Sequence, residues 1–167
     1  SGIFARINYD YKGKYLFEIS GRYDGTSRFA SDSRWGAFPS ASAGWRISEE
    51  PFFAPAKSLI NNMKIRASYG TQGNENVLNY TPYQDLYSVT WDGAQLGYTQ
   101  SFYGNPDLTW EKTDSFNLGI DFSILKDRIT MSLEGYMAYT KDLLYNMQNA
   151  TVTGFGTRIA NIGSTEN

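Results

Sequence analysis

The 167-residue chain contains neither cysteine nor histidine. The absence of cysteine excludes disulfide bonds, thiolate catalysis and cysteine-ligated metals, and the absence of histidine excludes His-based triads and the usual zinc sites. The formal net charge of -2 and the pI of about 5.1 leave no basic field that could hold nucleic acid. No run of roughly eighteen apolar residues is present, so no transmembrane helix is expected. We therefore expect no enzyme, no metal or other cofactor, and no nucleic-acid partner.

Aromatic residues are abundant, although the chain as a whole is not strongly apolar. They make up 16% of the sequence, whereas the mean hydropathy is only -0.47. A transmembrane β-barrel combines lipid-facing and lumen-facing residues in every strand, so its average hydropathy is modest. This composition is therefore compatible with such a barrel.

Apolar and polar residues alternate in several segments, and this pattern predicts β-strands with two unlike faces. We expect strands at about 3–11, 15–24, 39–48, 63–70, 116–123 and 128–139, and a seventh that begins near Arg158 and passes through Ile162. The fold class is therefore all-β, an antiparallel transmembrane barrel segment of about seven strands.

The charges of six strands share a face with the small polar residues. An Arg or Lys that faces lipid at mid-bilayer costs roughly 2–4 kcal/mol, whereas one that faces a wet lumen costs little. We therefore predict that the apolar face contacts lipid and that the lumen-facing charges are Arg6, Glu18, Arg22, Arg46, Arg66, Asp121 and Glu134. Lys112 and Asp114 share the parity of Phe116, and we expect them above the bilayer.

The connections between these strands alternate in length. Those at 12–14 and 126–127 are tight, those at 25–38, 72–108 and 143–157 are long, and the one at 49–62 is intermediate, with Pro51, Pro55 and a possible short helix. Outer-membrane barrels have short periplasmic turns and long extracellular loops. The three long loops are therefore predicted to be extracellular, although the intermediate connection is longer than this rule prefers.

The longest predicted loop carries aromatic side chains among Asn, Gln and Gly. Aromatic faces beside amides suit sugar rings or extended peptides. The candidate substrate-binding residues are Tyr83, Tyr87, Trp91, Tyr98 and Tyr103. Alternatively, these side chains pack the loop against itself.

Two other architectures explain part of the pattern. A soluble carbohydrate-binding β-sandwich also alternates apolar and polar residues, but it would bury its apolar positions between two sheets. Those positions are Ile7, Ile19, Ile65, Ile120 and Leu133. Tyr and Trp at the strand ends favour a membrane barrel, since aromatic girdles lie at both interfaces. The remaining alternative is a small self-standing barrel with a structural or adhesin role.

Four ordered blocks carry a family resemblance: DGTSRF at 24–29 followed by RWGAFPSASAGWRISEEPFF at 34–53, MKIRASYGTQGN at 63–74, NPDLTWEKT at 105–113 continuing into LGIDF at 118–122, and TKDLL at 140–144. Together they resemble the SusC/RagA-type TonB-linked receptors of Bacteroidetes outer membranes. The likeness covers nearly the whole chain and is weakest between Val77 and Phe102.

The resemblance implies a 22-stranded barrel plugged by an N-terminal domain. Such receptors import glycan or peptide fragments beneath a SusD-like lipoprotein lid, with energy from the TonB complex. Residues 1–167 hold no plug and no TonB box, and about seven strands cannot close a barrel of that diameter. We therefore expect a partial barrel domain that is a piece of a larger receptor. Glu18, Arg22, Asp24 and Arg28 are expected to form a cluster that braces the wall against the plug.

Overall fold

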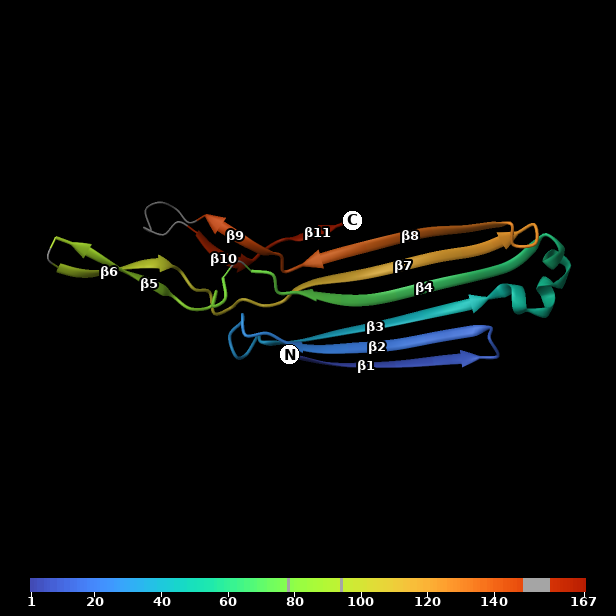
Figure 1. Ribbon diagram of the computed structural model, residues 1–167, viewed down its shortest axis with the longest axis horizontal. Helices are drawn as coiled ribbons and strands as arrows, with labels where there is room; N and C mark the ends of the chain where they lie inside the picture. The colour runs from blue at the N-terminus through green and yellow to red at the C-terminus, as the bar shows by residue number, and fades with distance from the viewer. Residues whose placement is uncertain (78, 94, 149–156) are drawn as a thin grey trace.

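The computed structural model describes residues 1–77, 79–93, 95–148 and 157–167, and its main element is a seven-stranded antiparallel sheet (Figure 1). The strands lie in the order β1 (Gly2–Tyr11), β2 (Tyr15–Gly25), β3 (Trp35–Arg46), β4 (Ile60–Asn74), β7 (Glu111–Ile124), β8 (Ile129–Lys141) and β11 (Ser164–Glu166). Two separate hairpins pair β5 (Leu86–Asp92) with β6 (Gln95–Phe102), and β9 (Leu144–Gln148) with β10 (Thr157–Asn161).

Short connections lie at one end of the sheet and long connections at the other (Figure 1). The intermediate connection forms two 3-10 helices, η1 (Ile47–Glu49) and η2 (Pro51–Ser58), which confirms the short helix expected there. Among the described residues, no helix is long and apolar enough to cross a membrane.

The six predicted wall strands are confirmed, but the boundaries of three were wrong. The fourth, predicted at 63–70, spans Ile60–Asn74, and the fifth, predicted at 116–123, begins at Glu111. The third strand is displaced toward the N-terminus. The loop predicted to reach Phe38 ends earlier, because β3 begins at Trp35 and pairs with the end of β2. Trp35 stacks on Tyr23 with ring centroids 5.1 Å apart, which extends the strand into the predicted loop. At the other end Ile47 enters η1 and is buried.

The predicted seventh strand was also misplaced. Residues 157–161 form β10, which pairs with β9 rather than with the wall, and the seventh wall strand is β11. The Asn161 amide explains the difference, because it donates to the carbonyls of Thr109 and Asp142 and so holds β10 against the loops. Gly163, with φ +76°, then turns the chain back to the edge of β8.

The register of the sheet confirms the alternation across six strands. One row joins Ile7, Ile19, Ala41, Tyr69, Phe116 and Met137, and the next row, on the opposite face, joins Asn8, Glu18, Ser42, Ser68, Asn117 and Tyr136. The apolar face is uncovered: Ile7 is 70% exposed and Leu133 is 60% exposed. Within the described ranges no second sheet covers this face, and its apolar positions are exposed rather than buried as the sandwich would require.

Aromatic side chains form a belt on the apolar face, at the end of the sheet where the short connections lie. Tyr15 stacks on Trp45 at 6.4 Å, and Phe52 of η2 packs edge-on against Trp45. The Glu50 carboxylate accepts hydrogen bonds from the Tyr15 hydroxyl at 2.7 Å, the Trp45 indole at 3.3 Å and the Lys14 ammonium at 3.2 Å. These donors stabilise the ionised form, and the Tyr15 bond contributes most to lowering the pKa of Glu50 below its ordinary value.

The buried core lies among the long connections at the other end. It comprises Phe29, Phe38, Val77, Leu108, Trp110 and Ile159. Trp110 packs edge-on against Phe29 at 5.6 Å and Phe38 at 5.2 Å, and its indole N–H donates to the Arg34 carbonyl. Three long connections are thereby joined into one packed unit.

We expect the substitution Glu50→Gln to lower stability at neutral pH and to remove a pH-dependent contribution. Because folding lowers the pKa of Glu50 below its ordinary value of 4.5, its contribution is present above that value and is lost as pH falls through the folded pKa. Urea unfolding of the receptor that contains this chain, measured from pH 7 to pH 3, tests this. Glu49→Gln is the control, since its ion pair with Lys57 is 3.8 Å long and exposed. An unchanged pH profile in Glu50→Gln would contradict the assignment.

We expect Leu108→Ala to loosen the buried core among the long connections, because Leu108 is 0% exposed. Truncation of a buried leucine costs about 2–5 kcal/mol. Hydrogen exchange of the amides around Thr109 should therefore become faster, since exchange reports local opening. Leu96→Ala removes the same atoms from a leucine that is 48% exposed and should leave exchange at Thr109 unchanged. Equal effects of the two substitutions would show that this cluster does not hold the loops.

Candidate functional site

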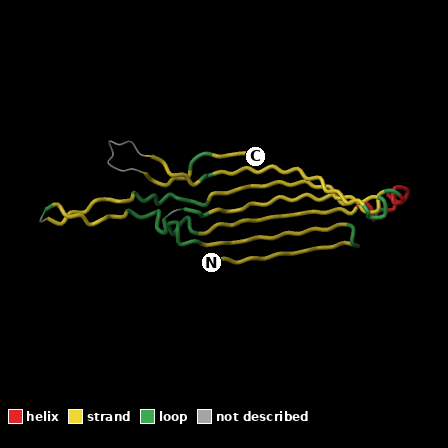
Figure 2. The backbone as a smooth tube through the Cα atoms, turned by 45° about the horizontal axis from the view of Figure 1, so that its top comes forward, coloured by secondary structure: helices red, strands yellow, loops and turns green. Residues whose placement is uncertain are grey.

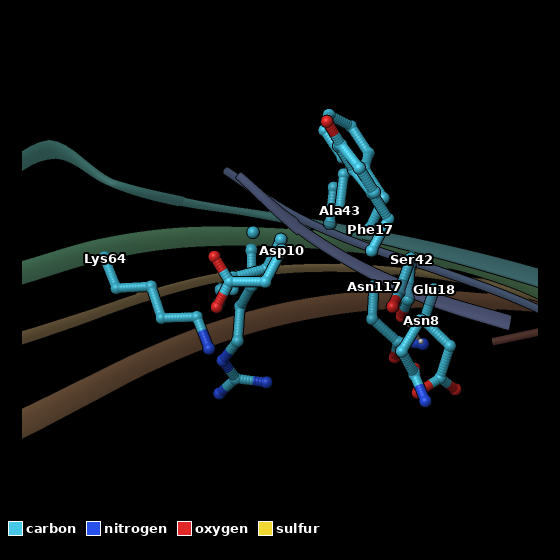
Figure 3. A pocket seen from close by; sticks show the side chains of 15 residues that line it. Asn8, Asp10, Phe17, Glu18, Ser42, Ala43, Lys64 and Asn117 are labelled. Carbon is cyan, nitrogen blue, oxygen red and sulfur yellow. Dashed lines mark hydrogen bonds between the residues drawn. The ribbon is translucent and has the colours of Figure 1, made fainter. Parts of the chain in front are cut away.

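The polar face of the sheet is hollowed between β1, β2, β3, β4 and β7. The hollow has a volume of about 560 Å³. Figure 3 shows Phe17 and Ala43 on one side of the sheet, with Glu18, Lys64 and Asn117 on the other. Neighbouring residues of the same strand therefore point to opposite faces of the sheet, apolar side chains to one face and charged side chains to the other.

Arg66 joins three strands at the centre of this face. Its Nε donates to Asp121 Oδ2 at 3.0 Å, and its Nη2 donates to Ser132 Oγ at 3.3 Å and pairs with Glu134. Gly119 opposes Arg66 in the register, and a Cβ at Gly119 would lie 2.9 Å from the guanidinium carbon. The glycine therefore gives the guanidinium room to reach across β7 to β8.

The other predicted lumen charges lie on the same face but in separate pairs. Arg6 pairs with Glu18 at 3.5 Å, and Arg22 pairs with Asp24 at 3.0 Å. Arg46 is opposite Lys64 in the register of β3 and β4.

The four-residue cluster expected around Arg28 was wrong. The Arg28 guanidinium instead donates to the carbonyls of Glu75 and Val77, both at 3.3 Å, in the loop region. In the part of the chain that the structure describes, no three or more carboxylates are grouped to hold a metal ion.

The predicted binding loop contains the β5–β6 hairpin, which projects beyond the sheet in Figures 1 and 2. Its register pairs Val89 with Tyr98, Tyr87 with Gln100 and Trp91 with Leu96, so these six side chains share one face of the hairpin. Tyr87, Trp91 and Tyr98 are 60%, 69% and 70% exposed. Three of the five predicted aromatic residues are thus brought together on an open platform.

The remaining two aromatic residues lie outside the strands of the hairpin. Tyr83 precedes β5 and is half-buried, and Tyr103 directly follows β6. They flank the base of the hairpin, where the Gly104 amide donates to the Asp85 carboxylate at 2.8 Å. The opposite face of the hairpin carries Ser88, Thr90 and Thr99.

Sequence reasoning missed the hairpin and therefore Val89, Leu96 and Gln100. The available signal was the Asp92-Gly93 dipeptide after the alternating positions Tyr87, Val89 and Trp91, because Asp-Gly between alternating apolar residues is typical of a tight hairpin turn. Gly93 has φ +64°, as such a turn requires.

Comparison with known families and curated proteins gives consistent matches. The family model described as "TonB dependent receptor-like, beta-barrel" matches residues 1–167. The chain is 44% identical over 169 residues to TonB-dependent receptor P39 of Formosa agariphila, covering 100% of this chain and 16% of that protein. It is 38% identical over 172 residues to TonB-dependent receptor SusC of Bacteroides thetaiotaomicron, covering 98% of this chain and 17% of that protein.

Solved structures give the same fold. The RagAB peptide importer in its closed-closed state matches 99% of this chain and 18% of its own chain, with a TM-score of 0.91 and 29% identity. Its open-open state matches with a TM-score of 0.87 and 30% identity. The chain therefore spans less than a fifth of the length of the relatives that it resembles.

Proposed function

Because this chain belongs to the TonB-dependent receptor-like β-barrel family, we propose that it supplies part of the wall and outer binding surface of a receptor that imports glycan or peptide oligomers. The SusC/RagA-type resemblance of its motifs is confirmed by the relatives and by the RagAB structures. The protein is located in the bacterial outer membrane, and its sheet is part of an antiparallel barrel.

The uncovered apolar face is the observation that carries this proposal. We propose that this face contacts the lipid bilayer and that the opposite face borders the lumen. Arg66, Asp121 and Glu134 then lie in a wet interior, where charges cost little. We propose that Arg6, Glu18, Arg22 and Arg46, which share this face in the register, also border the lumen and contact a plug domain.

The partners are proposed for the whole receptor, since the curated relatives are about six times longer than this chain. We propose that residues 1–167 are a partial barrel domain and that TonB acts through a more N-terminal part of the receptor. A SusD-like lipoprotein is the proposed lid; the solved RagAB importer supports a second component.

The β5–β6 hairpin is the proposed outer contact for cargo. Tyr87, Trp91 and Tyr98 present flat aromatic faces beside the Gln100 amide. Rings stack on the apolar faces of sugars or on peptide side chains, and the amide supplies hydrogen bonds. The relatives are receptors and a transporter, so we propose transport without catalysis, and their names favour it over an adhesin role.

We expect Trp91→Ala to weaken cargo binding by the full-length receptor about 5- to 30-fold, the loss that a central aromatic contact gives. Thr90→Ala, on the opposite face of the same strand, should leave the affinity unchanged. Titration with oligosaccharide and oligopeptide mixtures, each followed by calorimetry, identifies which cargo the platform takes. Equal affinity in the wild type and Trp91→Ala for both mixtures would refute the cargo role of the hairpin.

A further inference from the structure

Two lysines lie on the apolar face of the sheet, which is proposed to contact lipid. Lys112 and Lys141 share the face of Phe116 and Met137, and they are directly opposite each other in the register of β7 and β8. Like charges at opposed positions of an antiparallel pair destabilise it. The lysine pair therefore needs a counter-charge.

Asp114 is the nearby carboxylate, and it forms an ion pair with only one of the two lysines. Asp114 accepts from the Lys141 ammonium at 3.0 Å and from the Thr71 hydroxyl at 2.7 Å. Among the described residues, the Lys112 ammonium has no ion pair or hydrogen bond, and Gly73 opposes Lys112 on its other side without a side chain. Glu166 shares this face but lies on β11, two strands from Lys112.

Both lysines lie where the extracellular interface between membrane and water is expected. Lys112 precedes Phe122 by ten residues along β7, and the outward positions between Phe122 and Phe116 are apolar. At about 3.3 Å per residue and a tilt of about 40°, this spacing is about 25 Å along the membrane normal. Because Asp114 also faces outward within this span, the apolar part ends at Phe116, and both ammonium groups lie beyond it near the upper limit of a band about 25 Å tall, at the level of lipid headgroups.

A shallow apolar groove lies on the same face over β2, β3, β4 and β7, and its lining residue Phe116 is four residues from Lys112 along β7. It has a volume of about 440 Å³, its floor is formed by Ala41, Ala43 and Ala67, and Tyr69 and Phe116 line it. Phe116 and Tyr69 follow Asp114 and Thr71 on the same face of β7 and β4. Cations at headgroup height and an apolar groove below them match the two ends of a single lipid.

We propose that Lys112 and Lys141 bind the phosphate of an outer-leaflet lipid, with one of its acyl chains in the alanine-floored groove. Lys112 supplies the uncompensated charge, and Lys141 is held in position by Asp114. Headgroup phosphates and lysines attract each other at membrane surfaces. The inference rests on the proposed orientation of the apolar face toward lipid.

The experiment uses the full-length receptor in detergent, with lipopolysaccharide added as the probe and the thermal unfolding midpoint as the readout. We expect a saturable rise of Tm, with half-saturation at an about fivefold higher lipid concentration in Lys112→Gln. Ala41→Phe fills the groove without changing charge and should also weaken the effect. Lys126→Gln, in the exposed turn at the opposite end of β7, is the charge-matched control and should behave as wild type.

Two further probes identify the source of the phosphate. Dephosphorylated lipopolysaccharide should raise the Tm of the wild type no more than intact lipopolysaccharide raises the Tm of Lys112→Gln. Inorganic phosphate should not raise the Tm of the wild type. Identical curves for the wild type and Lys112→Gln, or a full rise with inorganic phosphate alone, would overturn the inference. Heat-modifiable migration of every variant is recorded first, so that failure to form a barrel, which would count against the proposed function, is distinguished from failure to bind lipid.

Discussion

The structure depends on the cost of placing a charge against hydrocarbon. An extended strand sends successive side chains to opposite faces, so a wall between lipid and water must separate apolar from charged residues at every step. The six long strands do this in register, from Ile7 on β1 to Met137 on β8. The proposed contact of the apolar face with lipid explains why the sheet has no packed core of its own, and the buried side chains of the main cluster gather among the long connections instead.

The motif blocks that identify the family serve this architecture rather than cargo binding. Phe29 and Phe38 come from the first block and Trp110 from the third, and they pack together to join the long connections. Trp45 and Glu50 belong to one block and build the belt at the other end of the wall. The platform on β5–β6 lies in the region where the resemblance is weakest. The residues that carry the family resemblance and the proposed binding surface are thus separated along the chain, as is common for binding loops on a rigid frame.

Strand identity and face could be predicted from the sequence because alternation is a local property. Pairing could not, because it depends on contacts between distant residues. Residues 157–161 have a strand pattern, but the contact of Asn161 with Thr109 assigns them to a hairpin rather than to the wall. The seven charges were predicted on one face, yet the contacts of Arg66 with Asp121 and Glu134 depend on register and on the space above Gly119. Likewise, Tyr87, Trp91 and Tyr98 share a face only because of the hairpin register.

The central claim is that Ile19 faces lipid while its neighbour Ser20 faces water. Residues 1–167 contain no cysteine, so in a receptor whose other cysteines, if any, are replaced by serine, a single cysteine at either position can carry a fluorophore. In receptor reconstituted into vesicles, a nitroxide on the lipid acyl chains should quench the fluorophore at position 19, whereas aqueous iodide should quench the one at position 20. Equal quenching of the two positions by the acyl-chain nitroxide would contradict the account.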